Sequence, residues 1–260
     1  MAAFGFLKLG VADGVGWLEY NRPPVNAFHW EMVGELSPAF DLLHADPAVR
    51  VIVLASAVPR YFSSGADLNV FAAITPARMR EWVDIVHAFV GRLRRSDKPL
   101  LAAIHGTAVG GGMEMTLHCD LRFAAADARI GQPEIAIGMI PPVGATQALA
   151  RLMGRPAAIR YLYDGRLHGA EEARRLGVID EVVPPDRLRQ EVSAYAAALA
   201  AKPAPALAAI RRSITEGGGL GFEEGLAIER EWAVRLAGTQ EFREGVSAFL
   251  ERRKPEWKRR

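Results

Sequence analysis

Residues 100–119 read LLAAIHGTAVGGGMEMTLHC, and the order of residue types in this stretch predicts a fold. The apolar run at 100–104 resembles a buried strand, and three glycines at 110–112 separate it from a helix-compatible stretch. Glycines let a ligand approach the backbone, and free N–H groups at the start of a helix favour negative charge. The stretch therefore predicts an α/β protein with an oxyanion-binding turn beside Glu114. Taken alone, it also fits a flexible turn followed by a Glu that the helix dipole stabilises.

A second turn of small residues, YFSSGAD at 61–67, follows a predicted strand at 51–56. Its backbone N–H groups can supply another donor, and two converging donors are the minimum for binding a carbonyl or thioester oxygen. The alternative for this segment alone is a loop that enters a helix, with Asp67 as the N-terminal cap.

A second acid, Glu134, lies 20 residues after Glu114 in the segment GQPEI. Its apolar neighbours predict partial desolvation, which would raise its pKa, whereas a solvated loop Glu is the alternative. Two carboxyl groups beside glycine-exposed backbone suit an enzyme that transfers protons and stabilises an oxyanion.

Composition limits the class of protein. The chain has 260 residues, of which 50% are hydrophobic, so it is long enough for one large domain or one domain with an appendage. No apolar run approaches the roughly 20 residues of a membrane span. The first ten residues lack the features of a secretory signal, and the single Cys119 cannot form an intramolecular disulfide, so we expect a cytoplasmic protein.

The net charge of +2 conceals a basic end. Residues 252–260 hold six basic side chains against Glu256. Such an end fits a solvated tail, a contact for a phosphorylated ligand or a nucleic-acid patch, and the scarcity of aromatic residues disfavours the last.

The chain changes character near residue 185. Before it, apolar runs predict strands at 15–20, 51–56 and 100–104, and apolar periodicity predicts helices at 30–44 and 76–94. Pro38 should kink or break the first helix. After it, Ala-rich stretches predict helices only, at 186–201, 203–216, 222–237 and 240–252. We therefore expect an α/β body at 1–185 and a helical region at 186–260.

Six segments together resemble the signatures of the enoyl-CoA hydratase/isomerase (crotonase) superfamily in order and spacing, and the chain is most similar to an enoyl-CoA hydratase. They are Asn21–Pro23, Phe62–Asp67, Gly110–Glu114, Gly131–Glu134, Gly144–Gln147 and Arg243–Phe249.

The resemblance implies a crotonase-like spiral of β-β-α turns that contains the active site, followed by C-terminal helices that form homotrimers, often paired into hexamers. It implies an acyl-CoA thioester as substrate, with its oxygen held by the backbone N–H groups of Ala66 and Gly111. No metal or redox cofactor is implied, because coenzyme A is part of the substrate. The substrate-binding positions implied are Ser64, Gly65, Asp67, Leu68, Gly110 and Arg252.

For the reaction, the resemblance implies that Glu114 and Glu134 hold one water and add it to a trans-2-enoyl-CoA, giving a 3-hydroxyacyl-CoA. Glu134 is the preferred proton donor to C2, and Glu114 activates the water. Alternatives within the superfamily are an enoyl-CoA isomerase or a hydratase for branched, cyclic or aromatic acyl groups. A non-catalytic nucleic-acid-binding or scaffold protein is a remote alternative.

The histidines and the cysteine show no spacing typical of a metal site or a nucleophilic triad. We expect structural roles for His105 and His118, and a buried position for Cys119. The remaining histidines, His29, His44, His87 and His168, are expected at the surface or in helices.

Overall fold

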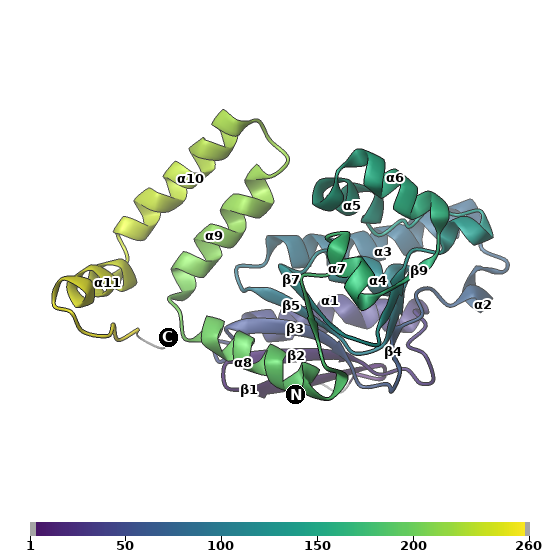
Figure 1. Cartoon of the computed structure of the whole chain (residues 1–260), viewed down its shortest axis with the longest axis horizontal. Coiled ribbons are helices and arrows are strands. Elements are labelled where there is room, and N and C mark those ends of the chain that lie inside the picture. Colours follow the sequence, from purple (N-terminus) through teal and green to yellow (C-terminus); the bar gives the residue numbers. More distant parts are fainter. Residues whose placement is uncertain (1–3, 258–260) are drawn as a thin grey trace.

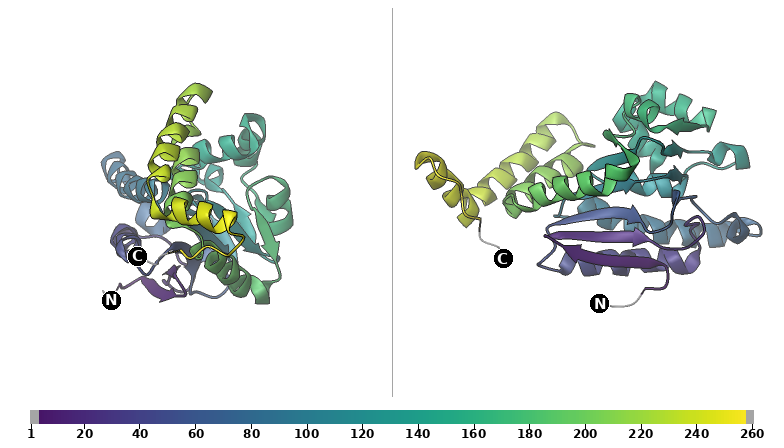
Figure 2. Two further views of the ribbon diagram at one scale, coloured as in Figure 1. Left: turned by 90° about the vertical axis from the view of Figure 1, so that its left-hand side faces the viewer. Right: turned by 60° about the horizontal axis from the view of Figure 1, so that its bottom comes forward.

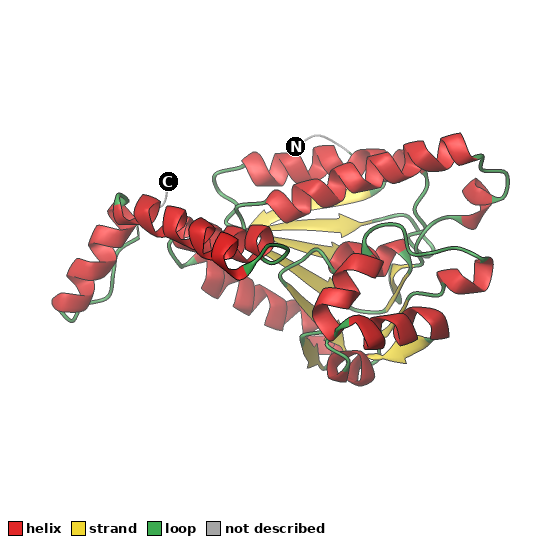
Figure 3. Cartoon of the chain, turned by 90° about the horizontal axis from the view of Figure 1, so that it is seen from above, coloured by secondary structure: helices red, strands yellow, loops and turns green. Residues whose placement is uncertain are grey.

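A computed structural model describes residues 4–257 and shows two β-sheets surrounded by helices (Figures 1 and 3). The larger sheet has six strands in the order β1-β2-β3-β5-β7-β10, and the smaller has four in the order β4-β6-β8-β9. The larger sheet comprises β1 (Leu7–Ala12), β2 (Val15–Tyr20), β3 (Val51–Ser56), β5 (Leu100–Ile104), β7 (Leu121–Ala125) and β10 (Glu181–Val183). The smaller sheet comprises β4 (Tyr61–Ser63), β6 (Thr107–Val109), β8 (Arg129–Gly131) and β9 (Leu167–Gly169).

The chain alternates between the two sheets in three successive turns of a spiral. The strand pairs β3–β4, β5–β6 and β7–β8 each place one strand in the larger sheet and the next in the smaller one. A helical segment follows each pair: α2 (Leu68–Phe71) with α3 (Pro76–Arg95), then α4 (Gly111–Thr116), then the 3-10 helix η1 (Glu134–Ile137). This is the expected β-β-α repeat.

Helices cover both faces of the larger sheet, which explains why β3 and β5 are apolar almost throughout. On one face, α1 (Trp30–Ala45) and α3 pack over side chains such as Ile52 and Leu54. On the other face, α8 (Leu188–Ala200) packs over Val51 and Val53. Alternate residues of one strand thus belong to two cores. Because α8 lies on the sheet, this helix contacts the α/β body directly. The expected division into a body at 1–185 and a helical region at 186–260 stays a prediction.

Pro38 does not break α1, which runs without interruption from Trp30 to Ala45. The expected break is therefore wrong. The ring of a proline inside a helix comes close to the backbone carbonyl group four residues earlier, which in α1 is that of Gly34. The helix is held on the sheet by buried side chains on both sides of the proline, among them Leu36 and Phe40.

The remaining helices after the spiral are α5 (Ala145–Met153), α6 (Arg155–Asp164), α7 (Ala170–Arg175), the 3-10 helix η2 (Pro185–Arg187), α9 (Ala204–Gly217), α10 (Phe222–Ala237) and α11 (Gln240–Leu250). The last three form an arm that extends away from the sheets, as Figures 1 and 2 show. The helices predicted at 203–216, 222–237 and 240–252 are thus confirmed to within two residues at each end. Among the described residues, none of the helices has the length and apolarity that a membrane span requires.

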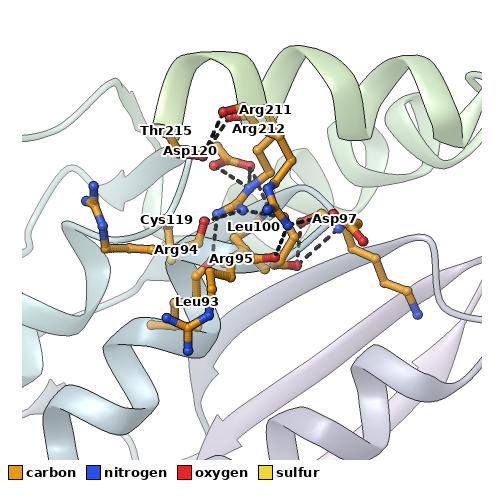
Figure 4. A network of polar contacts seen from close by, with 12 residues as sticks. Leu93, Arg94, Arg95, Asp97, Leu100, Cys119, Asp120, Arg211, Arg212 and Thr215 are labelled. Carbon is orange, nitrogen blue, oxygen red and sulfur yellow. Dashed lines mark hydrogen bonds and ion pairs between the residues drawn. The ribbon is translucent and has the colours of Figure 1, made fainter. Parts of the chain in front are cut away.

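A buried arginine joins the arm to the body (Figure 4). Arg211, on α9, donates from Nε to both carboxylate oxygens of Asp120 at 2.9 and 3.0 Å. Its other nitrogens donate to backbone carbonyls at the end of α3, including Leu93 O at 2.8 Å. Asp120 also accepts from the N–H of Leu100 at 2.8 Å, so one ion pair connects the arm, α3 and β5.

Candidate active site

The predicted site residues follow the carboxyl ends of three neighbouring strands. Strands β4, β6 and β8 are parallel, so their carboxyl ends meet at one edge of the smaller sheet. Ala66 lies three residues after β4, Gly111 two residues after β6 and Glu134 three residues after β8. In α/β folds, ligands bind outside the carboxyl ends of parallel strands. The topology therefore brings together segments that are far apart in the sequence.

The turns that carry Ala66 and Gly111 lie against each other. A Cβ atom on Gly65 would lie 2.9 Å from Val109 O and 3.3 Å from Gly111 N, and the φ of Gly65 is +80°. Only glycine fits this position, because of both the close approach and the positive φ. Within residues 4–257, neither Ala66 N nor Gly111 N donates a hydrogen bond to a protein group. Two unpaired N–H donors on adjacent turns are suited to binding an oxyanion.

The Glu114 carboxyl group is fully buried at the core end of the site. Its Oε1 accepts from the backbone N–H groups of Val143 at 2.7 Å and Ala145 at 3.0 Å. Its Oε2 has no hydrogen-bond partner within the described part of the chain. Burial raises the pKa of Glu114 to about 8, and the charge of Glu134 adds to this shift, while the two N–H donors oppose it.

Glu134 is the first residue of η1, and its carboxyl group lies beside the glycine turn at 110–112. A Cβ atom built on Gly110 would lie 2.8 Å from Glu134 Oε1, so the carboxylate occupies space that only glycine leaves free at 110. Burial raises the pKa of Glu134 to about 7, as its apolar surroundings predicted. The terminal amide of the buried Gln132 lies 3.2 Å from both carboxylate oxygens, and it can donate to them when its nitrogen is the atom turned toward Glu134.

The other implied substrate-binding residues near β4 have structural contacts. Ser64 N donates to Val25 O at 2.9 Å. Asp67 caps α2 by accepting from Asn69 N, and its carboxylate pairs with Arg22 at 2.9 Å, as the alternative reading of this segment expected. Leu68 begins α2 with an exposed side chain. Of these three residues, Asp67 is the one whose side chain is engaged, since Ser64 bonds through its backbone N–H and the Leu68 side chain is exposed.

Arg252 is not brought to the site within one chain. It follows α11 at the far end of the arm, whereas α4 lies at the opposite side of the body (Figure 1). Its neighbour Arg253 is paired with Glu244 and Glu251. The last three basic residues of the predicted tail, 258–260, lie outside the described residues.

Sequence reasoning missed the residues that orient Glu114. Val143 and Ala145 contribute through their backbone N–H groups, which no side-chain pattern reveals, although Ala145 belongs to Gly144–Gln147, one of the six segments that carry the resemblance. Cys119 is buried, as expected. The expectation for His168 is wrong, because it lies in β9 with its ring 3% exposed and stacked on Tyr161 at 4.6 Å.

Comparison with known proteins agrees with this geometry. The sequence model of the enoyl-CoA hydratase/isomerase family matches residues 10–260. A probable enoyl-CoA hydratase from Rhizobium meliloti is 36% identical over 95% of both chains, and a crotonyl-CoA hydratase from Syntrophomonas wolfei is 33% identical over 91% of this chain and 92% of its own. The crystal structure of an enoyl-CoA hydratase from Geobacillus kaustophilus superposes with a TM-score of 0.96, at 31% identity, over all of this chain and 98% of that one. The expected crotonase fold, with parallel sheets and C-terminal helices, is thereby confirmed.

Proposed function

Because the chain belongs to the enoyl-CoA hydratase/isomerase family, we propose that it is an enoyl-CoA hydratase, which converts a trans-2-enoyl-CoA to a 3-hydroxyacyl-CoA. The observation that carries this proposal is the pair of carboxyl groups of the buried Glu114 and the partly buried Glu134, both with raised pKa values. Hydration needs two such groups, since one must take a proton from water and another must give a proton to carbon.

In the proposed mechanism, the pair holds one proton and one water. The water oxygen bonds to C3 of the enoyl group while its proton passes to the ionised carboxylate, and the protonated carboxyl group delivers its proton to C2. The resemblance gives the donor role to Glu134. Because the pKa values of both carboxyl groups are raised, we propose that the two share a single proton before substrate binds.

The N–H groups of Ala66 and Gly111 are proposed to hold the thioester oxygen. Addition to C3 moves electron density onto this oxygen, so donors fixed at its position stabilise the enolate-like transition state more than the ground state. Because the donors are backbone groups, a substitution at Ala66 or Gly111 should act by moving the turn that carries the donor. No other cofactor is proposed, and the substrate supplies coenzyme A.

A homotrimer or hexamer is the proposed assembly, with Arg252 contributing to coenzyme A binding in a neighbouring subunit. The exposed apolar side chains of the arm support this proposal, because they have no partner within the described part of one chain. A cytoplasmic location stays a prediction.

Turnover of crotonyl-CoA and longer enoyl-CoAs, followed by loss of the conjugated-thioester absorbance, tests the function. We expect hydration, and a loss of several orders of magnitude in rate for Glu134→Gln. Glu171→Gln is the matched control, because Glu171 is an exposed residue paired with Arg174 on α7 and should retain wild-type rates.

The mass of the product separates the alternatives. Hydration adds one water to the substrate, whereas an isomerase leaves its mass unchanged. If the protein hydrates only branched, cyclic or aromatic acyl-CoAs, one of these replaces the simple enoyl-CoA as the proposed substrate. If it hydrates none of the enoyl-CoAs, the proposal is ruled out.

A further inference from the structure

Two histidines hold the turn that contacts Glu114. His87 Nε2 lies 2.7 Å from Pro142 O, and His118 Nε2 lies 2.8 Å from Val143 O. His87 belongs to α3, and His118 lies just after α4, so the turn at 142–145 is fixed to two different elements. Since a carbonyl oxygen only accepts, both imidazoles carry a proton on Nε2.

The same turn presents its other side to the catalytic carboxyl group. Val143 N and Ala145 N both donate to Glu114 Oε1. Oε2 has no hydrogen-bond partner within the described part of the chain. Val143 is thus held from both sides, by His118 at its carbonyl oxygen and by Glu114 at its N–H.

His118 lies tightly against the backbone of this turn. A Cβ atom on Gly144, whose φ is +107°, would lie 2.9 Å from His118 Cε1. The imidazole is buried, and within the described part of the chain its Nδ1 has no partner. An orphaned buried nitrogen costs free energy that an apolar side chain would avoid, so packing alone does not account for a histidine here.

Burial keeps His118 neutral, because it lowers the pKa of the imidazole to about 4. The charges of Arg94 on α3 and Arg122 on β7 add to this shift, while the hydrogen bond to Val143 opposes it. Neutral His118 retains its Nε2 proton, so its hydrogen bond to Val143 does not change across the range in which the two glutamates titrate.

We propose that His118, assisted by His87, is a positioning residue that fixes the turn at 142–145 so that two backbone N–H groups hold Glu114 Oε1 and leave Oε2 to the reacting water. This inference rests on the proposed hydratase function for its kinetic part. Without the histidine, the turn can move away from Glu114, and the carboxylate loses both its orientation and the donors that stabilise its ionised form.

His118→Leu tests the proposal, because it keeps an apolar volume and removes the donor. We expect kcat to fall by about 10- to 100-fold with KM nearly unchanged, as for a misplaced catalytic group. The pKa of Glu114, measured by carbon-13 NMR of the carboxyl group and assigned with Glu114→Gln, should rise above the wild-type value. His118→Gln, which can donate from Nε2 to the same carbonyl, should recover part of both losses.

His87→Gln and His87→Leu repeat the comparison at an exposed position where folding is not at risk, and only the Leu variant should lower kcat. His105→Leu is the matched control, because His105 Nε2 also lies at hydrogen-bonding distance, 2.9 Å, from a backbone carbonyl, that of Val58, away from this turn. Unchanged kcat and Glu114 pKa in His118→Leu would overturn the proposal, as would equal losses in His105→Leu. The titration requires no turnover, so it tests the positioning role even if wild-type protein hydrates no enoyl-CoA.

Discussion

The two oxygens of the Glu114 carboxyl group have different surroundings. Oε1 accepts two backbone hydrogen bonds, whereas Oε2 has no partner in the described structure and lies in a buried position. Water would solvate the ionised form more effectively than this site does, which is why burial dominates the pKa. Under the proposed function, the ionised form of this group serves catalysis at a cost in folding stability.

That cost has a defined pH dependence. With a pKa of about 8 in the folded protein and its ordinary 4.5 in the unfolded chain, Glu114 binds more protons in the folded state between these values. The free energy of unfolding should therefore fall as the pH rises from 4.5 to 8. Glu114→Gln, whose Oε1 can still accept both N–H bonds, should flatten this fall and be more stable than wild type at pH 8. Urea denaturation at several pH values measures it.

Glu134→Gln serves as the comparison. Because the pKa of Glu134 is about 7, this substitution should change the pH dependence of the free energy of unfolding over a range that ends at a lower pH. Equal slopes in wild type and Glu114→Gln would show that Glu114 is not protonated in the folded protein.

Gly110 controls the position of Glu134. Gly110→Ala should lower kcat strongly, because the new Cβ would lie 2.8 Å from Glu134 Oε1 and displace the carboxylate. Gly154→Ala is the matched control: Gly154 also has a positive φ and a backbone conformation suited to glycine, but no atom lies within 4 Å of its added Cβ. Both variants should lose stability, of order 1 kcal/mol, while only Gly110→Ala should lose activity. Steady-state kinetics and thermal unfolding separate the two effects, and equal activities would refute the steric argument.

At the residue scale, the sequence allowed the two glutamates and the two glycine-bearing turns to be predicted, because each lies in a short segment of distinctive composition. The partners of Glu114 could not be predicted, since Val143 and Ala145 are 29 and 31 residues away and act through backbone atoms. A structural role was expected for His118, and its hydrogen bond to Val143 O is what indicates the proposed positioning role.

At the scale of elements, the attachment of α9 depends on Arg211. Arg211→Met should destabilise the protein by about 3 kcal/mol, because Asp120 and several carbonyls of α3 lose a buried cationic partner. Arg212→Met, one residue further on, removes more exposed contacts with Asp97 and Glu216 and should cost less than about 1 kcal/mol. Chemical denaturation of both variants measures the difference, and similar losses would contradict the importance of the buried pair.

The elements that could be predicted are those that are long and strongly patterned. The strands at 15–20, 51–56 and 100–104 have the predicted bounds, because each is a largely apolar run in the larger sheet. The strands of the smaller sheet have three residues each, too few for a periodic pattern, and they form because neighbouring strands pair with them. Pro38 misled the prediction because the packing of α1 on the sheet outweighs the lost hydrogen bond.

At the scale of the whole molecule, the arm carries apolar side chains that a monomer leaves in water. Phe222 is 80% exposed and Phe249 is 83% exposed. We expect a mass of three or six chains by light scattering, and Phe222→Glu with Phe249→Glu should reduce it, because a buried charge without a partner disrupts an apolar interface. Leu42→Glu, on α1, is a control that should keep the wild-type mass. A monomeric wild-type protein would contradict the expected assembly.

The three turns of the spiral contribute different groups to the proposed site. The first turn supplies the backbone donor Ala66, the second supplies both the donor Gly111 and the acid Glu114, and the third supplies the acid Glu134 after β8. Under the proposed function, a substitution after β8 can therefore replace one acid while both oxyanion donors stay in place. Such a scaffold lends itself to evolving new reactions on one class of activated acyl group, since one of its two acids lies on a loop separate from the donors.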